Sequence, residues 1–229
     1  MKVVILAGGL GTRLSEYTKK LPKPMVLIKN KPIILYIIEH YLKYGYKDFI
    51  IAAGYKKKII KNFFNKKYKN FNIKVIDTGL KTMTGGRIKK LQKTIGNETF
   101  LLTYGDGLCN VDLRKLVNFH KKNKFLCTLT AVRPPARFGA IKIKQNKVTY
   151  FREKSSLDEG WINGGYFICE PYIFKKILNS KTFFEKEPLE TLSKMNKLGA
   201  FKHSGFWQCM DTMRDKEILE KKIAKNEHL

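Results

Sequence analysis

The chain has 229 residues, enough for one compact domain with a sizeable core and too few for two large independent domains. Hydrophobic residues make up 43% and aromatic residues 12%, which excludes a chain too polar to fold. The formal net charge of +27 would suit a nucleic-acid-binding protein if the basic residues were concentrated in one region. Lysines are instead scattered along nearly the whole chain, so we expect compositional bias and no specific nucleic-acid partner.

The cysteines and histidines argue against zinc-binding, disulfide-linked and serine-hydrolase classes of protein. The four cysteines lie far apart without a CxxC pair, so neither a zinc site of that kind nor disulfides are expected. The four histidines form no constellation, and the absence of a GxSxG motif argues against a Ser/His/Asp nucleophile. No apolar run approaches the roughly 20 residues needed to span a bilayer, so we expect a cytoplasmic protein without membrane contact.

The first part of the chain alternates short apolar runs with helical periodicity. This is the pattern of βαβ units in a mostly parallel sheet covered on both faces. Apolar residues at i, i+4 spacing predict a helix that begins after Pro32 and ends at Gly45. Asp112 is expected to cap a second helix. The expected strands are 2–6, 48–52, 72–76, 99–104 and 126–132.

The chain becomes strand-rich after residue 133. Strands are expected at 139–144, 147–152 and 161–169, and helices near 171–178 and 188–196. We interpret this part as a lobe built onto the same sheet. The predicted fold class is therefore α/β, with a mostly parallel Rossmann-like sheet flanked by helices, in a single domain over residues 1–229.

A glycine-rich segment over residues 6–14 follows the first strand directly. Three glycines within four positions allow backbone N–H groups to wrap closely round a phosphate group. The segment lacks the GKS/T ending of a P-loop and does not match GxGxxG, so neither an ATPase nor a dinucleotide dehydrogenase is favoured. A tight turn without a ligand is the alternative. Arg13 and Lys23 favour a phosphate site because they supply matching charge.

Lys23 stands between Pro22 and Pro24, an arrangement that can fix an ammonium group at little entropic cost. Alone, such a segment is more often a surface turn. Together with the glycine-rich segment it resembles the GGxGTRL…PKP signature of the sugar-phosphate nucleotidyltransferase family. This family has a nucleotidyltransferase fold similar to that of GT-A enzymes.

The resemblance extends over nearly the full length of the chain, to the glucose-1-phosphate cytidylyltransferase branch. Its branch-specific parts are TMTGGR at 82–87 and GFWQCMDT at 205–212. The other matching segments are TYGDG at 103–107, RFGA at 137–140, EK at 153–154, INGGYF at 162–167 and EPL at 187–189. One departure is a shortened segment between Phe64 and Ile73, just before the TMTGGR element.

Two aspartates are the candidate metal ligands. Asp106 follows the strand expected at 99–104, at the carboxyl edge where open α/β sheets bind ligands, and Asp211 follows an aromatic turn. Two carboxylates from distant segments suit Mg²⁺, which takes its remaining ligands from water and phosphate oxygens. The alternatives are an ordinary turn residue for Asp106 and the N-cap of the last helix for Asp211.

The resemblance implies the transfer of a cytidylyl group from CTP to α-D-glucose 1-phosphate. CDP-glucose and pyrophosphate would form by direct in-line attack on the α-phosphorus, with Mg²⁺ as the cofactor and a homo-oligomer as the assembly. Residues of about 1–132 would bind the nucleotide, and those of about 133–229 would form the acceptor-binding, sugar-phosphate part. Two alternatives stay open: the same reaction with dTTP, UTP or another phosphorylated acceptor, and a non-catalytic regulatory or polyanion-binding homologue.

The resemblance also implies roles for individual residues. Arg87 is expected to read the cytosine base, and binding a phosphate or pairing with Asp77 is the alternative. For Asn163 and Gly164 the alternative is a β-bulge without a ligand. For Glu153 and Lys154 the alternative is a solvated charge pair at the end of a strand. The expected catalytic residues are Arg13, Lys23, Asp106 and Asp211, of which Asp106 and Asp211 hold the metal. The expected nucleotide-binding residues are Leu6, Ala7, Gly8, Gly9, Leu10, Gly11, Thr12, Arg13, Lys23, Thr82, Gly86, Arg87 and Gly105. The expected sugar-phosphate-binding residues are Glu153, Lys154, Asn163 and Gly164.

Overall fold

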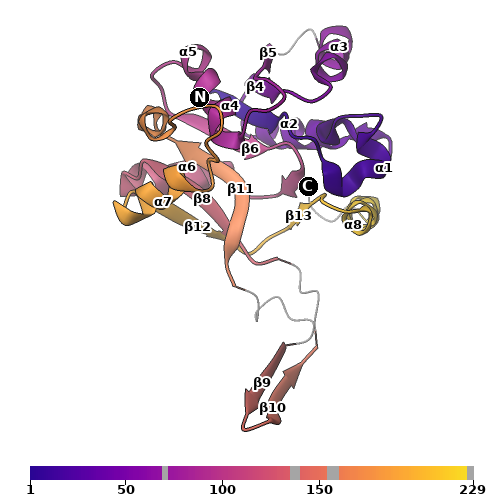
Figure 1. Ribbon diagram of the computed structural model, residues 1–229, viewed down its shortest axis with the longest axis vertical. Helices are drawn as coiled ribbons and strands as arrows, with labels where there is room; N and C mark the ends of the chain where they lie inside the picture. Colours follow the sequence, from indigo (N-terminus) through magenta and orange to yellow (C-terminus); the bar gives the residue numbers. More distant parts are fainter. Residues whose placement is uncertain (69–71, 135–139, 154–159, 226–229) are drawn as a thin grey trace.

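The computed structural model describes residues 1–68, 72–134, 140–153 and 160–225. Its centre is a seven-stranded sheet with the order β12-β8-β11-β6-β1-β4-β5 (Figure 1). All neighbours are parallel except β11, which runs antiparallel to both β6 and β8. The strands are β1 (Val3–Ala7), β4 (Asp48–Ala53), β5 (Asn72–Asp77), β6 (Phe100–Tyr104), β8 (Cys127–Val132), β11 (Ile162–Cys169) and β12 (Leu198–His203).

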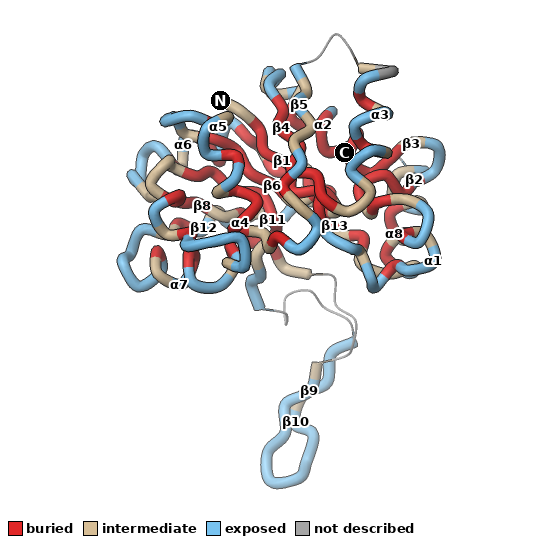
Figure 2. Tube along the Cα trace, turned by 45° about the horizontal axis from the view of Figure 1, so that its top comes forward, coloured by how far each residue is buried: buried red, intermediate tan, exposed pale blue. Residues whose placement is uncertain are grey.

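The sheet separates two hydrophobic cores, which explains why β1 is apolar at every position. Val3 and Ile5 face one core, whereas Val4 and Leu6 face the other, and all four residues are buried. Figure 2 shows that buried residues concentrate in the strands at the centre of the sheet. A strand buried on both faces reads as a continuous apolar run. The expected mostly parallel α/β sheet is confirmed.

Helices pack on both faces of the sheet. The first core includes apolar residues of α2 (Ile33–Lys43), α3 (Lys57–Lys67), α6 (Leu113–Asn123) and α8 (Met213–Ala224). The second includes residues of α4 (Thr84–Lys90), α5 (Gln92–Ile95), α7 (Glu187–Lys194) and the 3₁₀ helix Pro171–Lys176. The short elements are α1 (Ser15–Thr18), β2 (Leu27–Ile28), β3 (Lys31–Pro32) and the 3₁₀ turns Thr12–Leu14 and Lys23–Met25.

The sequence-based helix boundaries agree closely with the structure. Helix α2 begins directly after Pro32, and Gly45 follows its end with a positive φ of 83°. Asp112 caps α6 through its Oδ1, which accepts from the N–H groups of Arg114 and Lys115. The helix expected near 171–178 is a 3₁₀ helix, and β12 was not expected.

The strands expected at 139–144 and 147–152 form a separate hairpin that projects from the body (Figure 1). They are β9 (Ala140–Lys144) and β10 (Lys147–Arg152), and residue 139 lies outside the described residues. One face of the hairpin carries four exposed apolar side chains, those of Ile141, Ile143, Val148 and Phe151.

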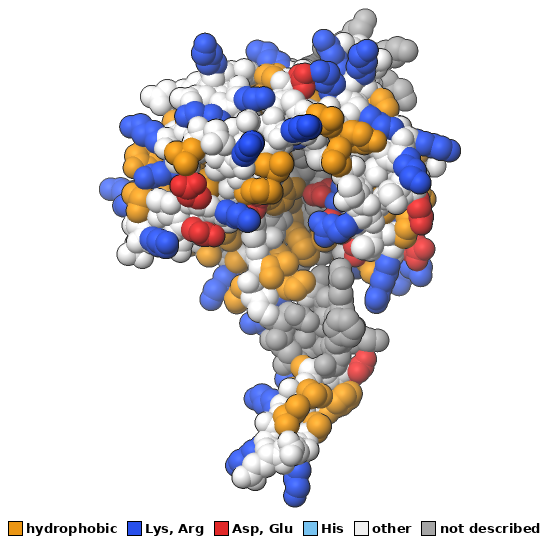
Figure 3. Space-filling view, viewed as in Figure 1, with side chains coloured by type: hydrophobic (Ala, Val, Ile, Leu, Met, Phe, Trp, Pro, Cys, Tyr) orange, Lys and Arg blue, Asp and Glu red, His pale blue; other side chains and the backbone are white. Residues whose placement is uncertain are grey.

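The surface charge has no single focus in the view of Figure 3. Lysine and arginine side chains are spread over the body and the hairpin, with acidic residues between them. In the described part of the chain no helix combines the length and apolarity needed to cross a bilayer.

Glycines in α4 allow that helix to approach a loop of the second half of the chain. A Cβ added to Gly86 would lie 2.5 Å from the carbonyl oxygen of Ser180 and 2.6 Å from its Cα. The N–H groups of Met83 and Gly86 donate to the carbonyls of Ser180 and Thr182, so this contact is also hydrogen-bonded.

We predict that Gly86→Ala lowers the free energy of unfolding by about 1–3 kcal/mol, the usual cost of overpacking. Gly9→Ala is the matched control, because a Cβ at Gly9 would meet no atom of the described residues within 4 Å. Urea denaturation monitored by circular dichroism measures both. Equal midpoints for the two variants would contradict the close packing of α4.

Candidate active site

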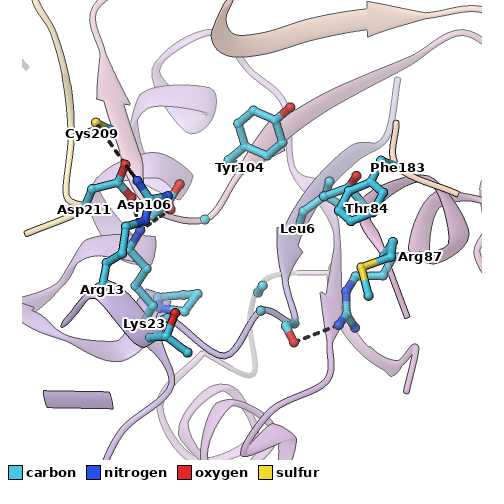
Figure 4. Close-up of a pocket in the computed structure, with 18 of the residues that line it drawn as sticks. Leu6, Arg13, Lys23, Thr84, Arg87, Tyr104, Asp106, Phe183, Cys209 and Asp211 are labelled. Carbon is cyan, nitrogen blue, oxygen red and sulfur yellow. Dashed lines mark hydrogen bonds and ion pairs between the residues drawn. The ribbon is translucent and has the colours of Figure 1, made fainter. Parts of the chain in front are cut away.

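A cavity of about 600 Å³ opens where β1 and β6 end and β11 begins. Because β11 is antiparallel to β6, its first residues lie at the same edge of the sheet as the last residues of β1 and β6. Loops that follow parallel strands form the usual ligand crevice of open α/β folds. Figure 4 shows side chains from these segments around the cavity.

Most of the predicted site residues line this cavity, although they come from distant parts of the sequence. The predicted lining residues are Leu6, Ala7, Gly8, Gly9, Gly11, Thr12, Arg13, Lys23, Thr82, Arg87, Gly105, Asp106, Asn163 and Asp211. They bring the glycine-rich segment, the two candidate metal ligands and one candidate sugar-binding residue to one place.

The glycine-rich segment is shaped by positive φ at Gly11 and by close packing at Gly8. Gly11 has φ 65°, and the Lys23 Cβ would be 3.2 Å from a Cβ at this position. The carbonyl of Gly8 accepts hydrogen bonds from the N–H of Tyr55 and from Nη2 of Arg87. A Cβ at Gly8 would lie 2.1 Å from the Arg87 guanidinium, so only glycine fits.

The guanidinium of Arg87 is directed at protein acceptors, and Figure 4 marks one of its hydrogen bonds. Its Nη2 donates to the carbonyl of Gly8 at 2.8 Å. Its Nη1 donates to Thr78 Oγ1 at 2.6 Å and to the carbonyl of Gly79 at 2.8 Å. The side chain is 4% exposed, and burial lowers the pKa of this group. The fork that was expected to read the base therefore braces the glycine-rich segment against residues 78–79.

A small sheet brings the two candidate metal ligands together. β7 (Gly107–Cys109) directly follows Asp106, and β13 (Trp207–Cys209) pairs with it so that Cys209 lies opposite Gly107. The N–H of Met210 then donates to the carbonyl of Asp106 at 2.8 Å. This pairing places Asp211 beside Asp106.

Asp211 is not the N-cap of the last helix. That position belongs to Thr212, whose Oγ1 accepts from the N–H of Asp215 in a capping box. The buried Asp215 carboxylate also accepts from the N–H of Asp211 at 3.1 Å. The backbone of Asp211 is thereby fixed while its carboxylate stays in the cavity.

The Lys23 ammonium lies between the two carboxylates. Its Nζ is 2.5 Å from Asp106 Oδ2 and 2.6 Å from Asp211 Oδ1, and Arg13 Nη1 is 2.8 Å from Asp211 Oδ2. Burial works against the charges on Lys23 and Asp211, but the opposite charges outweigh it. The pKa of Lys23 is raised, and that of Asp211 is lowered by its hydrogen bonds and attraction to Lys23 and Arg13.

The donor set fits a small hard cation. Two carboxylate oxygens converge on one ammonium group, which marks a position where positive charge is stabilised from both sides. Within the described residues no group of three or more Asp, Glu, His or Cys side chains could hold a metal. A cation here would take its other ligands from water and phosphate, as Mg²⁺ does.

Several predicted residues do not line the cavity. Gly86 faces the Ser180 backbone, and Leu10 points outward with 50% exposure. Gly164 packs against Val132, and its carbonyl accepts from Trp207 Nε1 at 2.8 Å. Glu153 follows the projecting hairpin strand β10, and Lys154 lies outside the described residues. The β-bulge considered for Asn163 and Gly164 is present, because the β11–β8 register shifts between Asn163 and Phe167.

Sequence reasoning missed some of the residues that line the cavity. Thr84, Tyr104 and Phe183 line it, and the Glu185 carboxylate accepts hydrogen bonds from the first two. Thr84 lies in the TMTGGR motif and Tyr104 in the TYGDG motif. The predicted site residues in the same motifs could therefore have indicated both. Phe183 and Glu185 lie in a loop without any motif.

The cavity places basic side chains and a glycine-rich segment beside a pair of carboxylates. Comparisons with known proteins show the family. The chain matches the Nucleotidyl transferase family over residues 2–216 and belongs to that family. It is a nucleotidyltransferase, which confirms the family resemblance of its motifs.

Individual relatives show which members of the family this chain is similar to. The glucose-1-phosphate cytidylyltransferase of Salmonella typhimurium is 45% identical, over 96% of this chain and 95% of that protein. The probable glucose-1-phosphate cytidylyltransferase of Bacillus subtilis is 38% identical, over 96% and 94%. The crystal structure of HddC from Yersinia pseudotuberculosis complexed with GMP-PN superposes with a TM-score of 0.76 at 27% identity, covering 97% of this chain and 99% of that one.

We predict that Lys23→Met raises the pKa of Asp211, because it removes the ammonium that stabilises the carboxylate. Carbon NMR of labelled aspartate carboxyls measures this pKa. Lys31→Met, which removes the partner of Glu39, is the matched control and should leave the Asp211 titration unchanged. An unchanged pKa of Asp211 in Lys23→Met would contradict the bridging position of Lys23.

The same ion pair predicts a pH dependence of stability. The folded-state pKa of Asp211 lies below its ordinary value, so the stabilisation is present above about pH 4 and is lost as the pH falls through the folded value. The difference in free energy of unfolding between wild type and Lys23→Met should therefore shrink on acidification.

Proposed function

We propose that this protein transfers a cytidylyl group from CTP to α-D-glucose 1-phosphate and releases pyrophosphate. The observation that carries the proposal is the cluster of Lys23, Arg13, Asp106 and Asp211 beside a glycine-rich segment. The 45% identity to the Salmonella glucose-1-phosphate cytidylyltransferase over nearly the whole chain supports the choice of substrates.

The nucleotide would bind against the glycine-rich segment. Backbone N–H groups of this segment can surround the triphosphate, and Arg13 and Lys23 supply positive charge where the pyrophosphate leaves. Arg13 is suited to this role because its side chain is 72% exposed and can turn from Asp211 towards a phosphate. Thr82 and Gly105 would form the wall next to the nucleoside.

The reaction needs positioning and charge neutralisation more than a protein nucleophile. A phosphate oxygen of the sugar phosphate attacks the α-phosphorus, a new P–O bond forms, and the bond to the β-phosphate bridging oxygen breaks as pyrophosphate departs. The attacking phosphate is already anionic, so no general base is required. This accounts for a cavity whose described lining contains no histidine.

Asp106 and Asp211 would hold a divalent cation, for which we propose Mg²⁺. When bound, the cation supplies Lewis-acid stabilisation of the reacting phosphates. The two carboxylates orient it, and their present partner Lys23 is then available to the phosphates. The β7–β13 pairing fixes the spacing of the carboxylates before the substrate arrives.

On the acceptor side, Asn163 is the predicted sugar-phosphate residue that lines the cavity. Glu153 and Lys154 remain proposed sugar-phosphate contacts. Gly164 acts indirectly, through its carbonyl hydrogen bond to Trp207. The nucleotide part would be residues of about 1–132, and the sugar-phosphate part those of about 133–229, within one domain.

Two wider expectations also remain proposals. A homo-oligomer is supported by the four exposed apolar side chains on one face of the β9–β10 hairpin, because a two-stranded hairpin alone is marginally stable in water. A cytoplasmic location is supported by the proposed substrates, which are intracellular phosphorylated metabolites.

The direct test is pyrophosphate release from a panel of CTP, UTP, dTTP and GTP with several sugar 1-phosphates and Mg²⁺. We expect activity that is greatest with CTP and glucose 1-phosphate. GTP belongs in the panel because the Yersinia structure carries GMP-PN. Activity that is greatest with another pair would replace the substrates, and no release with any pair would favour a non-catalytic homologue.

The carboxylate pair has its own test. Asp106→Asn should lower kcat by about two orders of magnitude or more while the protein stays folded, since metal-based stabilisation of phosphates supplies several kcal/mol. Asp112→Asn, at the N-cap of α6, is a control with normal activity. Enhancement of water proton relaxation by Mn²⁺ in the presence of CTP should also fall in Asp106→Asn, and wild-type relaxation there would refute the metal assignment.

Arg87→Lys tests whether Arg87 supports the glycine-rich segment or reads the base. Because the Arg87 fork contacts Gly8, Thr78 and Gly79, its loss should loosen the glycine-rich segment and lower kcat/KM for CTP and UTP by a similar factor. An altered CTP/UTP ratio would instead show that Arg87 reads the base.

A further inference from the structure

A carboxylate outside the predicted site connects three segments at the acceptor side of the cavity. Glu185 Oε1 accepts from the Tyr104 hydroxyl at 2.6 Å, and its Oε2 accepts from the Thr84 hydroxyl at 2.6 Å. Tyr104 ends β6, and Thr84 begins α4. Both line the cavity beside Asn163, at the start of β11.

The direction of each hydrogen bond in this network is determined. The N–H of Phe184 donates to Thr84 Oγ1, so the Thr84 proton points to Glu185. The N–H of Gly165 donates to Asn163 Oδ1 at 2.9 Å, which fixes the amide and leaves its Nδ2 facing the Tyr104 oxygen at 3.4 Å. A chain of donors therefore runs from Asn163 through Tyr104 to Glu185.

Packing holds Tyr104 in this position. Gly165 has φ 81°, and a Cβ there would lie 2.5 Å from the Tyr104 ring, so the bulge in β11 places its backbone directly against the ring. Burial, followed by the charge of Glu185, raises the pKa of Tyr104 far above its usual value. Tyr104 therefore remains protonated, and its single proton is committed to Glu185.

Among the described residues, this arrangement leaves one hydrogen of the Asn163 amide without a hydrogen-bond partner. An amide nitrogen carries two hydrogens, and the Nδ2 of Asn163 uses one towards Tyr104. The second is available to the cavity. A sugar hydroxyl oxygen is an acceptor of the kind that such a donor recognises.

We propose that Tyr104 and Glu185 are positioning residues, which orient the Asn163 amide so that its Nδ2 donates to a hydroxyl group of the sugar phosphate. The inference rests on the proposed function, since it assigns a role in binding the acceptor. Glu185 acts at a distance, because its carboxylate accepts the hydrogen bond from the Tyr104 hydroxyl and so leaves the Tyr104 oxygen as an acceptor for Asn163.

Steady-state kinetics of Tyr104→Phe with saturating CTP tests the proposal. We expect kcat/KM for glucose 1-phosphate to fall about 3- to 10-fold, the usual value of one hydrogen bond, mainly through KM. The KM for CTP should stay unchanged. Glu185→Gln should act in the same direction, because both hydroxyls donate to the carboxylate and a glutamine amide offers an N–H to one of them.

Non-additivity separates a positioning role from a merely structural one. Tyr104→Phe combined with Asn163→Ala should bind glucose 1-phosphate no worse than Asn163→Ala alone. Tyr36→Phe, which loses a hydroxyl hydrogen bond to the Ile28 carbonyl elsewhere, is the matched control with wild-type kinetics. Additive losses, or an unchanged KM in Tyr104→Phe, would overturn the proposal.

An NMR measurement distinguishes failure of this inference from failure of the proposed function. Glucose 1-phosphate should shift the Asn163 side-chain amide resonance of the ¹⁵N-labelled wild type, and less so in Tyr104→Phe. An active wild type without this shift contradicts the inference alone. A shift without pyrophosphate release would uphold the acceptor contact and refute the proposed transfer.

Discussion

The contact on which the site depends is the Lys23 ammonium between the carboxylates of Asp106 and Asp211. Lys23 and Asp211 are 188 residues apart, so the contact exists only in the folded chain. Two carboxylates placed side by side would repel each other and favour protonation of one of them. Lys23, with Arg13, keeps the pKa of Asp211 low and thereby preserves the negative charge of that carboxylate.

Main-chain hydrogen bonds bring these groups together, so few side chains have to be ordered to form the cluster. The β7–β13 pair and the Asp215 carboxylate fix the main chain at Asp106 and Asp211, while the 3₁₀ turn Lys23–Met25 presents the lysine. On the other side of the cavity, Arg87 ties the glycine-rich segment to residues 78–79. Both sides of the cavity are therefore held in place by hydrogen bonds within the protein, as the proposed electrostatic catalysis requires.

The fold was predictable where a strand is buried on both faces. The apolar runs around Val4 and Ile50 have no polar face that could be exposed to solvent. Such runs are typical of strands buried on both faces in a parallel sheet, so this part of the fold follows from the sequence. β12 was missed because Lys202 and His203 interrupt its apolar pattern at an edge of the sheet. β7 and β13 are too short to give any periodicity, although they position both carboxylates.

The candidate site was predictable as a set of residues more than as a set of contacts. Asp211 and Thr212 are both good N-cap residues, and only the three-dimensional structure shows that Thr212 takes that position. Gly86 does permit a close approach, but to the Ser180 backbone instead of a base. Glu185 lies in a loop without a recognisable motif. Its partners Thr84 and Tyr104 are distant in the sequence, so only the folded structure shows its role in the cavity.

The central claim is that Asp106 and Asp211 form a metal site whose cation replaces the Lys23 ammonium. The most direct measurement is anomalous X-ray diffraction from crystals of the protein grown with Mn²⁺ and a non-hydrolysable CTP analogue. We predict an anomalous peak bonded to one oxygen of each carboxylate, with Lys23 moved onto the phosphates. A peak that contacts neither carboxylate, with Lys23 still bridging them, would contradict the account.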